Sequence, residues 1–218
     1  MFVRTDEGVY ESALLREQSW LQHGFSSRYP SVWPGEYTRL KQIHSSIVAV
    51  GAPGRDLPEH GDAIVTRQPG EWVGIRTADC VPILIADPRA RVVGAIHAGW
   101  RGTVAEIARL TVETMMSEYG SDPVNLLAAI GPCISECCFE VGPEVGQQFQ
   151  PAFPERTEFG RVDLAEANRR QLLRAGLGET HIDSSGLCTA CCESEFHSWR
   201  RDKDLSGRMV AAIQIRQT

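Results

Sequence analysis

A series of short β-branched runs in the middle of the chain constrains the fold more than any other feature. The runs follow one another between residues 47 and 96, and Gly, Pro or Asp residues separate them. Runs of this length and composition are typical of neighbouring strands in a sheet. The last two should form an antiparallel hairpin with a turn at Asp87–Arg91. The expected strands are Ile47–Val50, Ala63–Thr66, Val73–Ile75, Val81–Ala86 and Val92–Ile96.

Helical signals appear only after these strands. Thr103-Val-Ala-Glu106 has the form of a capping box and precedes apolar residues at helical spacing, which predicts a helix from Thr103 to a stop at Gly120. The rest of the chain predicts shorter elements: strands and loops over 1–40, a strand at Leu126–Ile130, a short helix at Pro143–Phe149, a helix from the cap Asp163 to near Gly176, and a strand at Met209–Ile215.

Strands grouped first and then mixed with helices favour an α+β fold over a doubly wound parallel sheet. A chain of 218 residues without repeats or a low-complexity linker is expected to form one domain over 1–218. Its net charge of -6, with only short Lys/Arg pairs, argues against nucleic acid or a membrane surface as a partner. Asp6 and Glu7 interrupt any signal peptide, so we expect a cytoplasmic protein, by default a monomer.

The cysteines divide into one and six. Their total of seven excludes a complete disulfide framework, and a cytoplasmic chain keeps its thiols reduced. Cys80 stands alone, whereas the other six lie in two late clusters, Cys133…Cys137-Cys138 and Cys188-Thr-Ala-Cys191-Cys192. The CxxC of the second cluster is compatible with a closed zinc site of four thiolates. The apolar and small residues that flank both clusters favour buried free thiols instead.

Three metal-capable side chains lie at expected strand ends or turns: His44, Cys80 and His97. The expected hairpin would bring Cys80 and His97 together. One thiolate and two imidazoles leave a fourth tetrahedral position free, which is the layout of catalytic rather than structural zinc. The alternative is an ordinary role at a strand end for each residue, and spacing alone favours this alternative.

The residues after His97 suggest an anion pocket. Gly99 and Gly102 permit close backbone approach, Arg101 offers a fork of donors, and the expected helix start turns free N–H groups toward the same place. These features would suit phosphate. A tight strand-to-helix turn with a surface arginine explains them equally well. Trp100 and Trp199 could stack on a purine or pack in the core.

Several motifs in fixed order resemble one family. They are KQIHSS, GDAIVT, TADCVPILIADP, IHAGWRG, AIGPCISECCFEVG, VDLAEANRRQLL, CTACC and SWRRD…SGRM, from about His23 to Arg216. They closely resemble the proteins first named multicopper polyphenol oxidases or laccase-domain proteins, and later described as purine nucleoside phosphorylases with adenosine deaminase activity. One departure is Ser45, where the family usually has Gly after the histidine.

The resemblance implies a mixed sandwich fold related to cysteine-hydrolase-like toxins. It also implies zinc, or copper, held by His44, Cys80 and His97. The implied reactions are phosphorolysis of adenosine, inosine and S-methyl-5'-thioadenosine, and deamination of adenosine. Zinc by itself favours deamination, because it activates water, whereas an anion pocket favours phosphorolysis. A bifunctional site satisfies both.

The candidate residues follow from this interpretation. Asp62 and Asp79 are candidates for acid–base or supporting work beside the metal-capable residues, although turn capping is the favoured role for both. The candidate substrate-binding residues are Gly99, Trp100, Arg101, Gly102, Arg200 and Arg201.

Other functions stay open. Cys80 could act without metal as a nucleophile, with His97 or His44 as its base, in a hydrolase that edits peptidoglycan precursors. Copper-dependent phenol oxidation ranks last, because a single Cys-His-His site cannot hold the several coppers of a laccase. A metal-buffering or interaction module without enzymatic activity is a further alternative.

Overall fold

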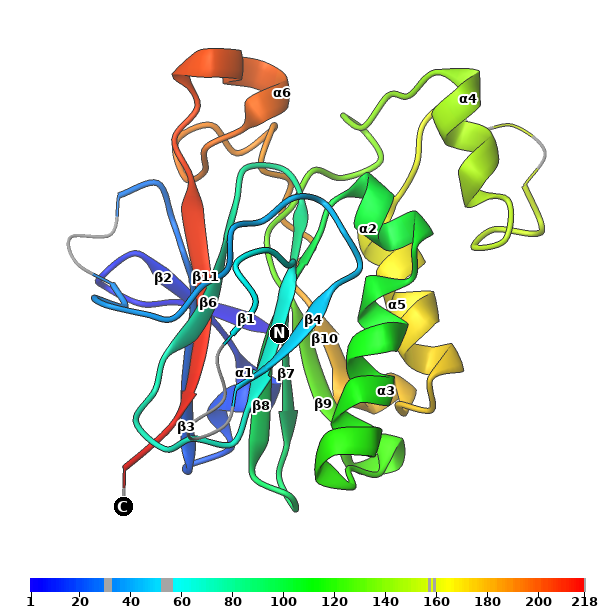
Figure 1. Cartoon of the computed structure of the whole chain (residues 1–218). Helices are drawn as coiled ribbons and strands as arrows, with labels where there is room; N and C mark the ends of the chain where they lie inside the picture. Colours follow the sequence, from blue (N-terminus) through cyan, green and yellow to red (C-terminus); the bar gives the residue numbers. More distant parts are fainter. Residues whose placement is uncertain (30–32, 52–56, 157, 159, 218) are drawn as a thin grey trace.

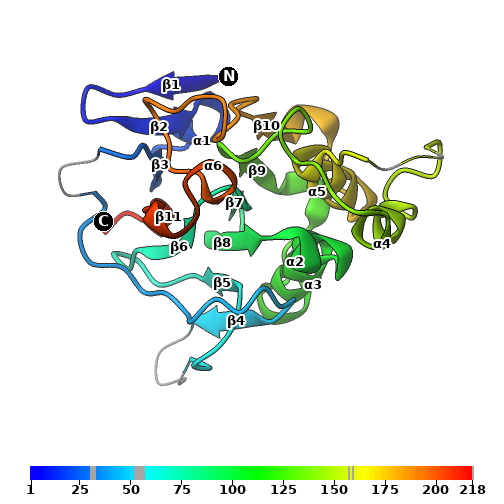
Figure 2. The same cartoon turned by 90° about the horizontal axis from the view of Figure 1, so that it is seen from above.

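The computed structural model describes residues 1–29, 33–51, 57–156, 158 and 160–217. Within these residues, two sheets stack face to face, and helices cover the outer face of the second sheet (Figure 1). The view from above shows the three layers in turn: first sheet, second sheet and helices (Figure 2). The expected α+β class, a sandwich of sheets flanked by helices, is confirmed. Its relation to cysteine-hydrolase-like toxins stays a prediction.

The first sheet joins the two ends of the chain. In its described part the strand order is β1-β2-β3-β11-β6, and every pairing is antiparallel. The C-terminal strand therefore lies in the interior of the sheet, between an N-terminal strand and a central one. The strands are β1 (Phe2–Arg4), β2 (Val9–Ser12), β3 (Leu21–Ser26), β6 (Val73–Thr77) and β11 (Met209–Ile215).

The second sheet is mixed, in the order β10-β9-β7-β8-β5-β4 over the described residues. Its outer pairs, β10 with β9 and β4 with β5, are parallel, and the inner pairs are antiparallel. The predicted hairpin is confirmed, since Val81 pairs with Ala98 at one end and Asp87 with Val92 at the other. The strands are β4 (Val48–Gly51), β5 (Ala63–Thr66), β7 (Val81–Asp87), β8 (Val92–Ala98), β9 (Leu127–Ile130) and β10 (Ile182–Ser184).

The hairpin strands are buried along their whole length because both faces of the second sheet are covered. On β7, Leu84 faces the first sheet, whereas Ile83 and Ile85 face the helices. Burial of each such side chain contributes about 1.5–3 kcal/mol. Two apolar cores therefore hold this hairpin rigidly, and its ends can position side chains accurately.

The helix after the hairpin begins earlier than the sequence predicts. α2 (Trp100–Val104) starts behind Gly99, and α3 (Ile107–Tyr119) follows a break at Glu106, whose φ is 58°. The predicted capping box at Thr103 is therefore wrong. Thr103 already lies in a helical turn, and its buried hydroxyl accepts a hydrogen bond from the Asn168 side chain at 2.9 Å. The predicted stop at Gly120 is confirmed.

The remaining helices are mostly short. α5 (Leu164–Arg174) begins as predicted, because Asp163 accepts the backbone N–H of Glu166 at 2.9 Å. α4 (Pro143–Gly146) and the 3-10 turn that follows match the predicted helix over 143–149. α1 (Ala13–Arg16) and α6 (Trp199–Asp202) are single turns. In the described part of the chain, no helix is long and apolar enough to cross a membrane.

Candidate functional site

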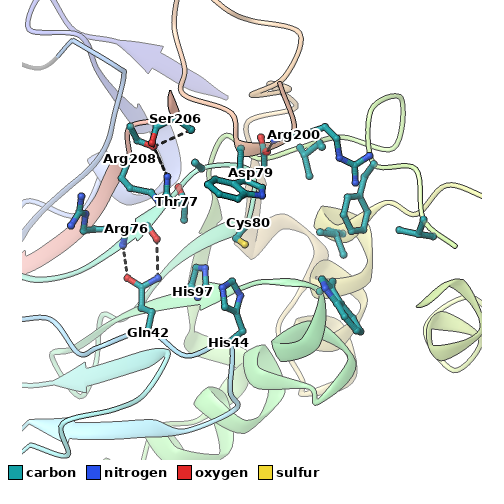
Figure 3. Close-up of a pocket in the computed structure, with 18 of the residues that line it drawn as sticks. Gln42, His44, Arg76, Thr77, Asp79, Cys80, His97, Arg200, Ser206 and Arg208 are labelled. Atoms are coloured by element: carbon teal, nitrogen blue, oxygen red, sulfur yellow. Dashed lines mark hydrogen bonds between the residues drawn. The ribbon is translucent and has the colours of Figure 1, made fainter. Parts of the chain in front are cut away.

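A cavity of about 1030 Å³ opens where β6 ends and β7 begins, between the start of α2 and the turn of α6 (Figure 3). One wall carries the three metal-capable side chains, and the opposite side carries cationic side chains. Apolar groups of the 134–145 segment and Trp199 line the rest. This volume is at the upper end of the range of about 300–1000 Å³ that is typical of small-molecule pockets.

His44, Cys80 and His97 converge on this cavity. Their donor atoms all lie within 4.8 Å of one another, and the two imidazole centroids are 4.9 Å apart. The hairpin register explains why Cys80 and His97 are close, because His97 pairs with Pro82, two residues after Cys80. His97 is buried, Cys80 is half-buried and His44 is exposed toward the opening. The predicted meeting of Cys80 and His97 is confirmed, and His44 joins them.

Gly99 allows the three side chains to come this close. A Cβ at Gly99 would lie 2.6 Å from Nδ1 of His44 and 3.2 Å from Sγ of Cys80. At Gly102, a Cβ would lie 3.0 Å from the carbonyl oxygen of Ser45. The predicted close backbone approach at both glycines is confirmed, and it brings the His44 turn against the start of α2.

Asp62 holds the His44 turn and His97 together. Its buried carboxylate accepts the backbone N–H groups of Ile43, His44 and Ser45 at 3.3, 3.0 and 2.6 Å. It also accepts the Ser45 hydroxyl at 2.6 Å and pairs with Nδ1 of His97 at 2.8 Å. These bonds stabilise His44 at a φ of 58° and turn Nε2 of His97 toward Cys80. Asp62 is therefore a positioning residue, and the serine hydroxyl adds a bond that glycine at position 45 would lack.

Asp79 plays a comparable role on the other side of Cys80. Its buried carboxylate accepts the Thr189 hydroxyl at 2.7 Å and the backbone N–H of Arg200 at 2.6 Å. Its carbonyl oxygen accepts the backbone N–H of Ile134 at 2.9 Å. The φ of 86° at Asp79 is tolerated because these contacts fix the turn. Asp79 thus joins the Cys80 turn to α6 and to the loop that precedes it.

The three groups around Cys80 shift one another's protonation. Burial alone would raise the pKa of the Cys80 thiol, but hydrogen bonds from His44 and His97 lower it to about 6. Burial alone would lower the pKa of His97, but Asp62 and Cys80 raise it to about 9. The pKa of Asp62 falls to about 2 despite burial, because His97 and Ser45 donate to it. The lowered pKa favours the thiolate form of Cys80, the form that binds metals and attacks electrophiles.

Cationic side chains gather on the other side of the cavity although the chain as a whole is acidic. Arg76 and Arg208 both line the cavity, and Figure 3 draws them on the same side of the imidazoles, near Gln42. The Gln42 side chain fixes this wall, because its amide bonds both the N–H and the C=O of Arg76 at 2.8 Å. Exposed Arg39 and Lys41 add positive charge. This wall suits an anionic ligand.

Among the predicted substrate-binding residues, some line the cavity and others do not. Trp100 lines the cavity, but in the described lining Arg101 does not take part, and its guanidinium stacks over the Trp100 ring at 4.3 Å. Arg200 lines the cavity and donates to the carbonyl oxygens of Cys138 and Glu140, both at 3.0 Å.

Arg201 points elsewhere. It pairs with Asp202 and donates to three backbone carbonyl oxygens, those of Thr189, Ala190 and Phe196. Substrate contact by Arg101 and Arg201 therefore has no support in this geometry.

Arg76, Arg208 and Gln42 were missed in the sequence. One signal was present: Arg76 is an exposed charged residue inside an otherwise buried strand. Arg208 lies in the SGRM segment, which served only as a family motif. Their convergence depends on the pairing of β11 with β6, in which Val210 lies opposite Arg76. Sequence spacing did not show that pairing.

The donor set fits a single transition-metal ion. One thiolate and two imidazole nitrogens suit zinc, and these two donor types also suit copper. The glycine at position 99 keeps the space beside these donors clear. With His44 exposed to the cavity, a bound ion would face the opening and keep a position for substrate or water. The fold and site thus define an α+β protein whose pocket combines metal-capable donors with cationic side chains.

The sequence comparison names the family. Residues 28–216 match the family model described as multi-copper polyphenol oxidoreductase laccase, and the chain belongs to this family. It is 44% identical over 186 residues to a purine nucleoside phosphorylase of Deinococcus radiodurans, covering 83% of this chain and 70% of that protein. It is 40% identical over 161 residues to adenosine deaminase RL5 of an unknown prokaryotic organism, and this match covers 70% of this chain and 61% of that protein. The crystal structure of YlmD from Geobacillus stearothermophilus superposes with a TM-score of 0.86 at 27% identity, over 99% of both chains.

Proposed function

We propose that this protein is a purine nucleoside phosphorylase that also deaminates adenosine, with adenosine, inosine and S-methyl-5'-thioadenosine as substrates. One observation carries the proposal: a single cavity has metal-capable donors on one wall and a cationic wall opposite. The first suits activation of water, and the second suits inorganic phosphate. The names of the relatives support the same pair of activities.

The cationic wall supports the phosphorolysis part of the proposal. Arg76 and Arg208 would bind phosphate and hold one of its oxygens against the anomeric carbon of the nucleoside. As that oxygen bonds to the sugar, the N-glycosidic bond breaks and its electron pair goes to the purine. Trp199 lines the cavity with 44% of its surface exposed, so its ring is available for stacking on the base. The products would be ribose 1-phosphate and the free base.

The wall with the metal-capable donors supports the deamination part of the proposal. His44, Cys80 and His97 would hold zinc, which when bound supplies Lewis-acid activation of water at neutral pH. Asp62 keeps Nε2 of His97 aimed at the site through its bond to Nδ1. The low pKa of Asp62 keeps it ionised, so it orients and does not donate a proton.

Product analysis with purified protein tests the proposal. With adenosine and phosphate we expect adenine and ribose 1-phosphate, and without phosphate only inosine. Arg76→Ala should raise the KM for phosphate about tenfold or more, because a charged hydrogen bond contributes about 1.5–3 kcal/mol. Arg101→Ala should leave that KM unchanged. Phosphate dependence that is lost in Arg101→Ala and kept in Arg76→Ala would refute the cationic wall.

A second candidate has one specific observation in its favour. Cys80, His97 and Asp62 form a connected chain of nucleophile, base and orienting carboxylate, with the thiol already ionised at neutral pH. This chain suits a metal-free cysteine hydrolase, such as one that edits peptidoglycan precursors. Hydrolysis of an amide-bearing precursor in the presence of a chelator, abolished by iodoacetamide at Cys80, would favour it over the nucleoside enzyme.

A further inference from the structure

The late cysteines meet in space although more than fifty residues separate their two clusters. The sulfurs of Cys137, Cys138, Cys188 and Cys191 all lie within 4.8 Å of one another. The individual separations include 3.4 Å from Cys138 to Cys191, 3.6 Å from Cys137 to Cys138 and 3.7 Å from Cys137 to Cys191. Cys137 lies 3.9 Å from Cys188. We call these residues the four-cysteine cluster.

The cluster corrects the expectation of buried thiols. Cys188 is buried, but Cys137 and Cys191 are exposed, and Cys138 is half-buried. Hydrophobic burial therefore does not explain why the sulfurs gather. None of the described cysteines is joined in a disulfide, and separations of 3.4–3.9 Å exceed the S–S bond length of about 2.05 Å.

These separations match tetrahedral coordination. Four sulfurs at about 2.3 Å from a central zinc ion would lie about 3.8 Å from one another. The four separations given above, from 3.4 to 3.9 Å, bracket this value, and all four sulfurs lie within 4.8 Å of one another. Four thiolates fill every tetrahedral position, which is the arrangement of a structural and not a catalytic site. All-sulfur tetrahedral donors are typical of zinc or iron, and exclude magnesium or calcium.

The backbone around the cluster is built to hold such a site. The two loops are clamped at Cys133 and Cys188, where Cys133 donates its N–H to the carbonyl of Leu187 at 3.2 Å and Thr189 donates to the carbonyl of Cys133 at 3.0 Å. The backbone N–H of Ser135 points at Sγ of Cys188 at 3.4 Å. Donors of this kind stabilise the charge of a metal-bound thiolate.

Two arginines bind the backbone of the same loops, and Arg200 also brings positive charge, whereas the charge of Arg201 is paired with Asp202. Arg200 donates to the carbonyl of Cys138 at 3.0 Å, and Arg201 donates to the carbonyls of Thr189 and Ala190 at 3.0 and 3.1 Å. A zinc ion with four thiolates carries two negative charges, and the guanidinium of Arg200 would offset part of this charge.

We propose that Cys137, Cys138, Cys188 and Cys191 bind a structural zinc ion that joins the 133–138 loop to the 188–192 loop. This site is separate from the one at His44, Cys80 and His97, and it does not depend on the proposed activity. Its place in the fold gives it a purpose. The first loop leads into Phe139 and Glu140, which line the cavity, and the second contains Thr189, which anchors Asp79. Zinc would thus fix the cavity wall that α6 completes.

Metal analysis of the purified full-length chain tests the proposal. Cys191→Ser should contain one equivalent of zinc less than Cys192→Ser, a matched control next to it but outside the cluster. Cys80→Ser should keep this equivalent, whatever the cavity holds. Cobalt substituted into Cys80→Ser should give the intense visible absorption of tetrahedral cobalt–thiolate coordination. Equal zinc content in Cys191→Ser and Cys192→Ser, or iron in place of zinc, would overturn the proposal.

Alkylation of the wild-type chain gives an answer that does not require a variant to fold. Cys137 and Cys191 are exposed, so without metal both should react readily with iodoacetamide. With zinc bound, mass spectrometry should find them about tenfold or more slower to react than in zinc-free protein, because the lone pairs of a ligated thiolate are engaged. Equal reaction rates with and without zinc, or a disulfide within the cluster of freshly purified protein, would overturn the proposal.

Discussion

Asp62→Asn is the substitution that probes the metal-capable wall most sharply. The asparagine oxygen can replace Oδ1 and keep the bonds to the His44 N–H and to His97. Its NH2 group would then replace Oδ2, the atom that in the wild-type chain accepts the backbone N–H groups of Ile43 and Ser45 at 3.3 and 2.6 Å. Two backbone donors would lose their partner and meet a third donor, and the Ser45 hydroxyl, which also donates to Oδ2, would have to turn and accept from the NH2 group instead.

The cost can be estimated from these contacts. Each hydrogen bond to a charged group contributes about 1.5–3 kcal/mol, and bonds that share one carboxylate are not additive. We therefore expect a loss of about 3 kcal/mol in the free energy of unfolding, measured by urea titration with chelator present. The loosened turn should also lower the zinc affinity of the His44, Cys80 and His97 site by about 10–100-fold, the usual effect of removing a partner that orients a ligand.

Asp87→Asn is the matched control. Asp87 is also buried, at the far end of the β7–β8 hairpin, and among the described residues its carboxylate is engaged through Oδ1, which accepts the N–H groups of Arg89 and Ala90 at 2.8 and 3.0 Å. Asparagine preserves both bonds, so stability and zinc affinity should change little. Zinc affinity that is the same in wild type and Asp62→Asn, by competition with a chromogenic chelator, would refute the orienting role of Asp62.

Three further predictions concern stability, the cavity wall and the substrate. Burial lowers the pKa of His23 to about 4, and its neutral Nε2 accepts the Ser12 N–H. The contribution of His23 to the free energy of unfolding is therefore fully present above about pH 6.5 and is lost as the pH drops toward 4. The free energy of unfolding from urea titrations should fall by about 2 kcal/mol between pH 7 and pH 5. His23→Gln should abolish most of this difference. Gly99→Ala should abolish metal binding at the cavity while leaving the fold intact by circular dichroism, because its Cβ would collide with His44; full metal occupancy would contradict this. Trp199→Ala should raise the KM for adenosine about tenfold, since stacking on a base contributes about 1–3 kcal/mol, with little change in melting temperature; an unchanged KM would remove the ring from the substrate site.

The sequence predicted the strands better than the start of the main helix. Runs such as Val81–Ala86 and Val92–Ile96 are buried on both faces, so composition and turn residues alone mark them. The helix start was misplaced because Thr103 and Glu106 have the spacing of a capping box, while Gly99 at the end of β8 allows the chain to turn into a helix at once. Local spacing could not show that Asn168 engages the threonine hydroxyl.

In the site, too, the sequence predicted local contacts but not contacts between distant segments. Cys80 and His97 could be brought together from the sequence, because a short hairpin fixes their register. The cationic wall and the four-cysteine cluster could not, because both depend on contacts between distant segments: β11 beside β6 for Arg76 and Arg208, and a bridge between Cys133 and Cys188 for the thiols. Arg101 was a candidate because it offers a fork of donors beside two glycines and the expected helix start, but its side chain stacks on Trp100.

The central claim is that one cavity unites metal-capable donors with a phosphate-binding wall. Its most direct test is the rate of adenine release from adenosine and phosphate, measured with Arg76→Ala and Cys80→Ala beside the wild type, together with inosine release without phosphate. The proposed function predicts that Arg76→Ala loses phosphorolysis and keeps deamination, whereas Cys80→Ala loses zinc from the cavity and loses deamination. Full deamination by Cys80→Ala, or undiminished phosphorolysis by Arg76→Ala at low phosphate, would contradict it.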